Sequence, residues 1–397
     1  MREQFLPFSP PAIGEQEISE VVDTLRSNWI TTGPKVKQFE SKFAEFVGAH
    51  GALGVSSCTD ALQVALAALG VGPGDVVLTT TLTFCATAHV VEHLGARPFL
   101  VDVDRDTLNI SPQALIAAID QVKKKNLGTL RAVIPVHFAG HPVDMAEILE
   151  IAREHSLAIL EDAAHALPAS WGNEMVGSVP ESGIQRAAAF SFYATKNMTT
   201  GEGGMLTATP DWLEEARLWA QHGMNRDAWR RYGKGGSWRY DVVRPGFKCN
   251  MTDIEAALGM VQLNRLNEFQ NTRRAIVSLY QEAFDGMDSF DTPCVKPNVE
   301  HAWHLYPLRL KLRRWTIDRG QFIEELAKRN IGASVHFIPL HEMTFYRDRY
   351  NLSDKDFPVA AEEAHRLVSI PLNANMSRSD ALDVIDAVQD IQKHFGQ

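Results

Sequence analysis

The stretch from Ala187 to Thr209, AAAFSFYATKNMTTGEGGMLTAT, decides the fold that the sequence predicts. Its first six residues, 187–192, are almost all apolar, which is typical of a strand buried on both faces. Lys196 follows, and then a glycine-rich turn at 201–204 that lets a ligand approach the backbone closely. Burial at a strand end lowers the pKa of a lysine and makes its amine nucleophilic. Many such lysines instead extend their ammonium group into solvent, so the rest of the chain must decide.

Short apolar runs recur on both sides of this stretch and alternate with helical patterns, which predicts an α/β domain with a mostly parallel sheet. In such sheets ligands bind beyond the carboxyl ends of the strands. The predicted strands are 52–55, 76–80, 98–103, 132–136, 158–161, 187–192 and 204–208. The predicted helices between them are 61–69, 85–94, 112–124 and 145–155.

Composition excludes several classes of protein. The chain has 397 residues and a net charge of −10, which argues against nucleic acid or an anionic membrane as a partner. No apolar run approaches the ~20 residues of a membrane span, and the first residues lack the apolar core of a signal peptide. Four cysteines without a CxxC spacing predict neither a disulfide framework nor a metal site. We therefore expect a cytoplasmic protein.

Hydroxyl and aromatic side chains follow the first two predicted strands. Ser57, Cys58 and Thr59 open a predicted helix, where free N–H groups can bind a phosphate. The alternative is an ordinary helix N-cap. Phe84 follows the second strand and offers a ring that could stack on a planar ligand. A phosphate-binding P-loop motif and a GxGxxG fingerprint are both missing from the sequence, which argues against an ATPase or a dinucleotide-dependent dehydrogenase.

Asp162 and His165 follow the strand at 158–161. A carboxylate at that strand end could keep a pyridine nitrogen protonated, and an imidazole three residues later could lie over the ring; the alternative is an acidic residue that caps the next turn. Together with Lys196, these positions supply the parts that pyridoxal phosphate (PLP) requires: an anion cradle, ring stacking, a carboxylate and an amine. We therefore interpret Lys196 as a Schiff-base lysine.

Nearly the whole chain resembles the DegT/DnrJ/EryC1/StrS sugar aminotransferases, which are PLP-dependent enzymes of fold type I. The most specific segments are ILEDAAHA at 159–166, SFYATKNMTTGEGG at 191–204 and PGFKCNMTDIEAALGMVQL at 245–263. The segments FLPFS at 5–9, HAWHLY at 301–306 and HFIPLHEMTFYRDRY at 336–350 look most like the branch that aminates a UDP-4-keto-pentose.

The resemblance implies a role for each matching residue. Lys196 binds the cofactor covalently and later acts as general acid and base, Asp162 pairs with the pyridine nitrogen, and Phe84 and His165 enclose the ring. Many family members have glutamine in place of His165.

The resemblance also implies a phosphate site made by Ser191 and the backbone of Cys58 and Thr59. Asn250 would reach the phosphate of the neighbouring subunit's cofactor, so that a homodimer shares its active sites. Lys248 is the alternative for this contact, because many family members read YNYRM where this chain reads FKCNM.

The expected activity is transfer of an amino group from L-glutamate to a keto group, at C4, of a nucleotide-linked sugar in polysaccharide or lipopolysaccharide biosynthesis. Alternatives are a dTDP-3-keto or another 4-keto-6-deoxy sugar as acceptor, a sugar dehydratase, or a non-catalytic regulatory protein on the same fold. The dehydratase branch has histidine at the lysine position, so Lys196 argues against it.

Further residues are candidates for the sugar site. The segment 28–34 could line a pocket or be a plain linker, and the basic, tryptophan-containing segment 222–250 could face a diphosphate or be a solvated loop. The candidate substrate-binding residues are Trp29, Thr31, Thr32, Arg230, Arg231 and His336.

The chain divides into two predicted domains. Residues 1–265 form an N-terminal segment and the large PLP-binding domain, and residues 266–397 form a smaller α+β domain. We expect a helix over 252–266 at the boundary and a strand over 335–340 that carries His336. A helix over 15–27 has Ile18, Val21, Val22 and Leu25 on one face.

Overall fold

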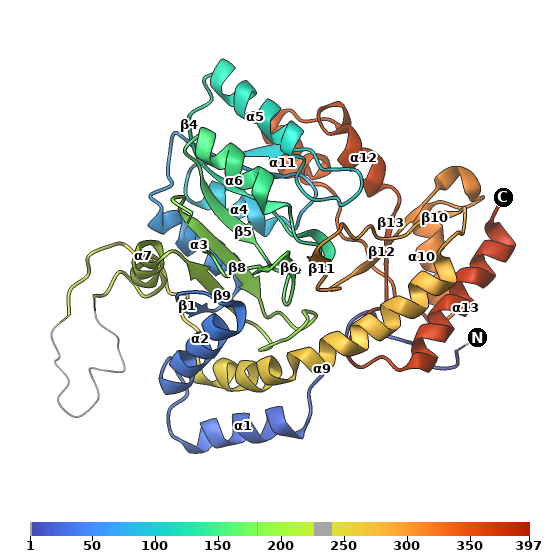
Figure 1. Cartoon of the computed structure of the whole chain (residues 1–397), viewed down its shortest axis with the longest axis horizontal. Helices are drawn as coiled ribbons and strands as arrows, with labels where there is room; N and C mark the ends of the chain where they lie inside the picture. The colour runs from blue at the N-terminus through green and yellow to red at the C-terminus, as the bar shows by residue number, and fades with distance from the viewer. Residues whose placement is uncertain (1, 181, 226–239) are drawn as a thin grey trace.

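The computed structural model describes residues 2–180, 182–225 and 240–397 (Figure 1). Within these ranges, a sheet of seven strands has the order β1-β9-β8-β5-β4-β2-β3. Its strands are β1 (Ala52–Val55), β2 (Asp75–Thr80), β3 (Arg97–Val101), β4 (Thr129–Ile134), β5 (Ala158–Asp162), β8 (Arg186–Ser191) and β9 (Gly204–Ala208). All neighbours pair in parallel except β9, which is antiparallel to β8 and β1. The predicted mostly parallel α/β sheet is confirmed.

Helices cover both faces of this sheet (Figure 1). Along β8, Ala187 and Ala189 belong to one apolar cluster, while Ala188 and Phe190 belong to another on the opposite face, as the period-2 alternation of a strand requires. The first face packs on α3 (Cys58–Ala68), α4 (Ala86–His93) and α7 (Pro210–Ala220). The second packs on α2 (Pro34–Val47), α5 (Pro112–Lys124), α6 (Met145–Glu154) and α9 (Asp253–Phe284).

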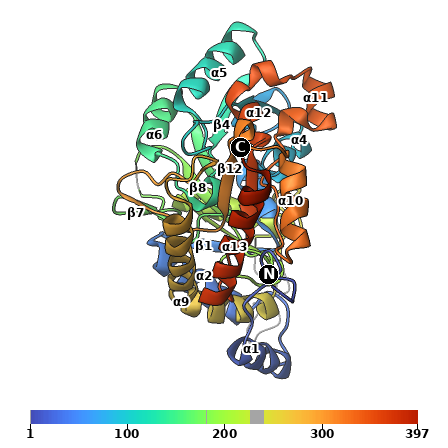
Figure 2. The ribbon, with the colours of Figure 1, turned by 90° about the vertical axis from the view of Figure 1, so that its right-hand side faces the viewer.

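The C-terminal part forms its own apolar cluster around an antiparallel sheet, and Figure 2 looks onto it. This sheet contains β10 (Phe290–Asp291), β12 (Tyr306–Leu310) and β13 (Leu367–Ile370), packed with α10 (Arg319–Lys328) and α13 (Arg378–Phe395). Between β12 and β13 lie η2 (Leu312–Arg314), η3 (Leu340–Glu342), α11 (Thr344–Tyr350), η4 (Asp354–Asp356) and α12 (Pro358–Ala364). The remaining elements are α1 (Glu15–Arg26), η1 (Phe138–Gly140), β6 (Ser170–Trp171), β7 (Glu174–Met175) and β11 (Val299–Glu300).

Helix α9 joins the two parts and is longer than the predicted helix over 252–266. It begins with a capping box in which Thr252 and Glu255 satisfy each other's backbone N–H groups. Leu263 and Leu266 pack in the core of the large sheet, whereas Ile276 and Val277 pack in the C-terminal cluster. The helix is therefore continuous through the proposed division between residues 265 and 266.

The predicted strand over 335–340 is wrong. Residues 335–339 have no regular structure, and 340–342 form η3. A bridge between Ser334 and Ser369 is not extended into a ladder. Instead, the His336 side chain contacts Ser369 in β13 of the C-terminal sheet, and the Phe337 ring stacks on His165 just beyond the end of β5. Local apolar character predicted a strand, but non-local contacts hold this segment as a loop.

Candidate active site

Lys196 lies in the turn that follows β8, where its backbone N–H donates to the Tyr193 carbonyl at 2.9 Å. Its pKa is lowered to about 8, because the desolvation that accompanies burial outweighs the stabilising charges of Cys58 and Asp162. A lysine with a pKa near 8 is partly unprotonated at neutral pH, so its amine is available as a nucleophile and as a base.

Asp162 ends β5 and is buried. Its Oδ2 atom accepts from the Thr87 hydroxyl at 2.8 Å, and its Oδ1 atom accepts from the Ala164 N–H at 3.2 Å. Burial raises the pKa of Asp162, and these donors together with the positive charge of Lys196 oppose the rise. A cation that binds next to this carboxylate would be strongly stabilised, because the surrounding dielectric is low.

An aromatic group surrounds His165, which is buried beside the end of β5. The Phe337 ring stacks on it with centroids 5.7 Å apart and planes 18° apart, and the His304 ring lies 4.4 Å away. Burial, followed by the charges of Lys196 and His336, holds the pKa of His165 well below its usual value. In the described part of the chain its Nδ1 atom has no hydrogen-bond partner, which leaves a buried polar atom available to a ligand.

Phe84 and His336 complete this aromatic group. The Phe84 side chain is 59% exposed and lies 6.2 Å from Phe337 between centroids. His336 is half-buried, contacts the Ser369 hydroxyl at 3.0 Å through Nδ1, and stacks on Phe8 at 5.5 Å. Burial and the charge of Lys196 lower the pKa of His336 to about 4, so it is neutral at pH 7.

The N-terminus of α3 forms the anion cradle. The Ser57 hydroxyl caps the helix by accepting from the Asp60 N–H at 3.0 Å, so the N-cap interpretation holds. Among the described residues, the N–H groups of Cys58 and Thr59 have no backbone acceptor and stay available for an anion. The Cys58 thiol contacts the Ala189 carbonyl at 3.5 Å in the core, so it is the backbone of Cys58 that faces a ligand.

Ser191 pairs with Gly204 across β8 and β9, which places both residues beside the cradle. A Cβ atom on Gly204 would lie 2.4 Å from the Ser57 carbonyl carbon and 2.6 Å from the Cys58 nitrogen. Only glycine therefore allows β9 to approach the start of α3 this closely.

The segment 29–33 is tied to the start of α9. The Thr32 hydroxyl donates to the Met251 carbonyl and accepts from the Asn250 amide, each at 2.5 Å, and the Asp253 N–H donates to the Thr31 carbonyl at 3.1 Å. The Trp29 indole donates to the Thr32 carbonyl at 3.2 Å. The segment is thus a fixed loop and not a free linker.

Asn250 itself pairs with Val55 at the end of β1 and accepts a short hydrogen bond from the Lys248 ammonium group. Both candidates for the inter-subunit contact therefore lie together beside the strand that leads into the cradle. Arg230 and Arg231, the remaining predicted substrate residues, lie outside the described residues.

Sequence reasoning missed several residues that the fold brings to this site. The Asn197 amide donates to the Ala302 carbonyl at 2.7 Å and contacts His304 Nδ1 at 3.1 Å, and the Ser9 hydroxyl donates to the Thr195 carbonyl at 3.1 Å. The missed residues are Phe8, Ser9, Thr87, Asn197, His304 and Phe337.

These residues fit PLP. The helix N-terminus could accept a phosphate, the buried carboxylate could hold a proton on a pyridine nitrogen, and the half-buried amine could react with an aldehyde. When bound, the cofactor supplies an electron sink for chemistry at the carbon that carries the amino group. In the chain itself, Asp162 would keep the pyridine nitrogen protonated, and the Lys196 Nζ atom would carry the proton that moves.

The chain is similar to known proteins over nearly its whole length. The DegT/DnrJ/EryC1/StrS aminotransferase family matches residues 11–389. The Bacillus subtilis spore coat polysaccharide biosynthesis protein SpsC is 47% identical over 99% of this chain and 98% of its own. The Streptococcus pneumoniae protein Spr1654, which bears the name of a sugar aminotransferase, has been solved in PLP and PMP forms.

The PMP form of Spr1654 aligns at 33% identity with a TM-score of 0.88, over 98% of this chain and 99% of that one. Helicobacter pylori PseC, an aminotransferase involved in the biosynthesis of pseudoaminic acid, aligns at 26% identity with a TM-score of 0.87, over 99% of this chain and all of that one. The predicted fold and the predicted PLP cofactor are confirmed, and the function class is that of a sugar aminotransferase.

Proposed function

The chain belongs to the DegT/DnrJ/EryC1/StrS aminotransferase family, and we propose that it transfers the amino group of L-glutamate to the C4 keto group of a nucleotide-linked sugar. The preferred acceptor is a UDP-4-keto-pentose, and 2-oxoglutarate is the second product. The observation that carries the proposal is Lys196 itself, whose pKa near 8 arises from burial in a site that also contains the Asp162 carboxylate. A non-catalytic protein would have no need to keep a reactive amine there.

Each cofactor contact has a counterpart in this chain. Lys196 binds the cofactor, Asp162 holds its ring nitrogen, and Phe84 and His165 enclose its ring. Ser191, with the N–H groups at the start of α3, binds its phosphate. His336 would border the sugar site, because it lies close enough to Lys196 for the charge of that amine to lower its pKa.

We place the active sites in a homodimer in which Asn250, held beside Lys248, reaches the partner's cofactor phosphate. The N-terminal segment supports an interface. Helix α1 directs Glu17 inward, where it pairs with Arg265 at 2.7 Å, and leaves Ile18 and Leu25 about half exposed. A row of exposed apolar side chains on one segment is typical of a protein contact.

The location we propose is the cytoplasm, where nucleotide sugars are available. In the described residues, none of the helices is long and apolar enough to cross a membrane. A dTDP-3-keto or another 4-keto-6-deoxy sugar is the alternative acceptor, because a few loop contacts decide between such sugars. Trp29, Thr31 and Thr32, together with the basic segment that contains Arg230 and Arg231, are the proposed sugar contacts.

A panel of UDP- and dTDP-linked 3-keto and 4-keto sugars tests the proposal. Each is incubated with the purified protein, PLP and L-glutamate, and the amino sugar and 2-oxoglutarate are quantified by mass spectrometry. We expect the UDP-4-keto-pentose to give equal amounts of both products. A preference for a dTDP-3-keto sugar would replace the proposed acceptor, and an absence of product with any acceptor or donor would favour the non-catalytic alternative.

A further inference from the structure

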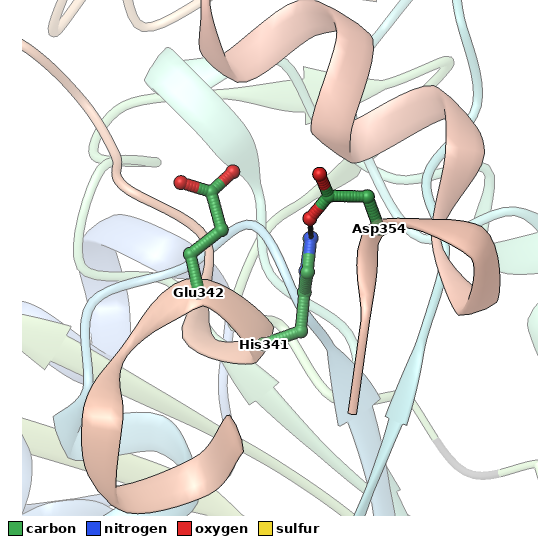
Figure 3. A group of neighbouring side chains, drawn as sticks. All are labelled: His341, Glu342 and Asp354. Carbon is green, nitrogen blue, oxygen red and sulfur yellow. Dashed lines mark ion pairs between the residues drawn. The ribbon is translucent and has the colours of Figure 1, made fainter. Parts of the chain in front are cut away.

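A second group of polar side chains lies on the C-terminal part of the chain, between β12 and β13. His341 and Glu342 end η3, and Asp354 begins η4 (Figure 3). One potential ligand atom from each residue lies within 4.8 Å of the other two. In Figure 3 a ring nitrogen of His341 is directed toward the Asp354 carboxylate, and the Glu342 carboxylate lies beside them. The group contains no cysteine, so the cysteine spacing in the sequence could not reveal it.

The imidazole of His341 is fixed in place. Its Nδ1 atom lies 2.8 Å from the Thr81 hydroxyl, which also accepts from the His341 backbone N–H at 3.3 Å. The Leu340 N–H donates to the Thr81 carbonyl at 2.8 Å, and the imidazole stacks on Phe357 at 4.7 Å. Such an anchor on one ring nitrogen orients the other nitrogen, as is usual for a metal-binding histidine.

The other nitrogen, Nε2, has no hydrogen bond within the residues that the structure describes, although the His341 side chain is fully buried. Its nearest charged atom is Asp354 Oδ1 at 3.6 Å, beyond hydrogen-bond distance. The Glu342 Oε1 atom is likewise buried and without a partner in this part of the chain. Buried polar atoms normally have a hydrogen-bond partner or a counter-charge. His341 Nε2 and Glu342 Oε1, which lie near the Asp354 carboxylate, have no hydrogen-bond partner among the described residues.

We propose that His341, Glu342 and Asp354 bind a divalent transition-metal ion of the Zn²⁺ class. One imidazole and two carboxylates are ligands that Zn²⁺ accepts, with water in the remaining position. Mg²⁺ and Ca²⁺ prefer sites made of oxygen ligands alone.

The geometry allows the site to close. Ligand distances of about 2.0–2.2 Å place neighbouring ligand atoms of a tetrahedral site roughly 3.4 Å apart. The observed spread of up to 4.8 Å must therefore contract. The Asp354 side chain is 68% exposed and free to rotate toward the fixed imidazole.

The ion would have a structural role. It would join the two ends of the segment that contains α11, and through Thr81 it would hold this segment against the loop after β2. That loop leads to Phe84 and Thr87 in the active site, so the site lies next to the catalytic machinery without belonging to it.

Zinc binding to the PLP-loaded protein tests the proposal. After treatment with a chelator, the protein is dialysed against Zn²⁺ and the bound metal is measured by mass spectrometry. We compare wild type with Asp354→Asn and Glu342→Gln, which remove one charge each and keep the size of the side chain. The matched control is Asp348→Asn, because Asp348 in α11 is 61% exposed and pairs with its neighbour Arg347.

We expect one tightly bound Zn²⁺ per wild-type chain and per control chain, with affinity at least about tenfold lower in each ligand variant. Mn²⁺ should compete for the site, and Mg²⁺ at the same concentration should not. Absence of stoichiometric Zn²⁺ in wild type would overturn the proposal. So would equal binding by wild type and both ligand variants, or equal competition by Mg²⁺.

Discussion

Replacing Thr87 by valine tests how this chain controls the proton on Asp162. The Thr87 hydroxyl lies 2.8 Å from Asp162 Oδ2 inside the protein, and valine keeps the shape of the side chain without the donor. A hydrogen bond to a charged group contributes about 1.5–3 kcal/mol, and 1.36 kcal/mol corresponds to one pKa unit. The substitution should therefore raise the pKa of Asp162 by about one to two units.

The direction of the pKa change depends on which protonation state of Asp162 the Thr87 hydroxyl stabilises. It donates to the carboxylate, so its loss favours the protonated acid, and a higher pH is needed to keep Asp162 ionised. The acid limb of the pH–rate profile should move upward by about one to two pH units. The assay is the reaction of the PLP-loaded enzyme with L-glutamate, followed by the loss of visible cofactor absorption at a series of pH values.

Two variants serve as controls. Thr87→Ser keeps the hydroxyl and should restore the wild-type profile. Thr83→Val removes a neighbouring buried hydroxyl, which contacts Thr87 at 2.9 Å and not Asp162, and should give a smaller shift. If Thr87→Val binds PLP but has the acid limb of wild type, the hydroxyl does not set the charge on Asp162 and this reasoning fails.

Three further predictions concern the amine, the cradle and the loop at 29–33. Because burial lowers the pKa of Lys196 to about 8, the rate of PLP uptake by the apoprotein should rise with pH and level off above about 8; a rise that continues to pH 10 would contradict this. Gly204→Ala places a Cβ atom 2.6 Å from the Cys58 nitrogen, so PLP affinity, measured by titration, should fall about ten- to a hundredfold. Asp253 accepts from backbone N–H groups at the start of α2, so Asp253→Ala should lower stability to urea by about 1–3 kcal/mol. The same variant should raise KM for the sugar more than KM for glutamate. Equal changes in the two KM values would show that the loop at 29–33 is not part of the sugar site.

Local patterns made the large sheet and the main candidate positions predictable. Each strand is a short apolar run, and residues with reactive groups lie at the strand end or in the turn that follows, as Asp162 and Lys196 do. Parallel pairing then brings these residues to one edge, which the pattern alone implies. The seven predicted strands needed no knowledge of distant contacts.

The rest depends on contacts between distant parts of the chain. His304 contacts both Asn197 and His165, which lie more than 100 residues away in the sequence, and Phe8 reaches His336 from the other end of the chain. The sequence of the segment 335–339 alone predicts a strand. The contacts that hold it as a loop involve residues distant in sequence, such as Ser369 and His165, and are seen only in the folded chain. The same holds for Asp354, which meets His341 after the chain turns back beyond α11.

Reductive trapping of the cofactor on the protein tests most directly whether Lys196 is the reactive amine. The PLP-loaded protein is treated with borohydride and digested, and the modified lysine is identified by mass spectrometry, with and without prior addition of L-glutamate. We predict a single pyridoxyl label on Lys196, which glutamate prevents by converting the cofactor before reduction. A label on a different lysine, or a failure to label Lys196 in protein that has bound PLP, would contradict the assignment of Lys196 as the reactive amine of this site.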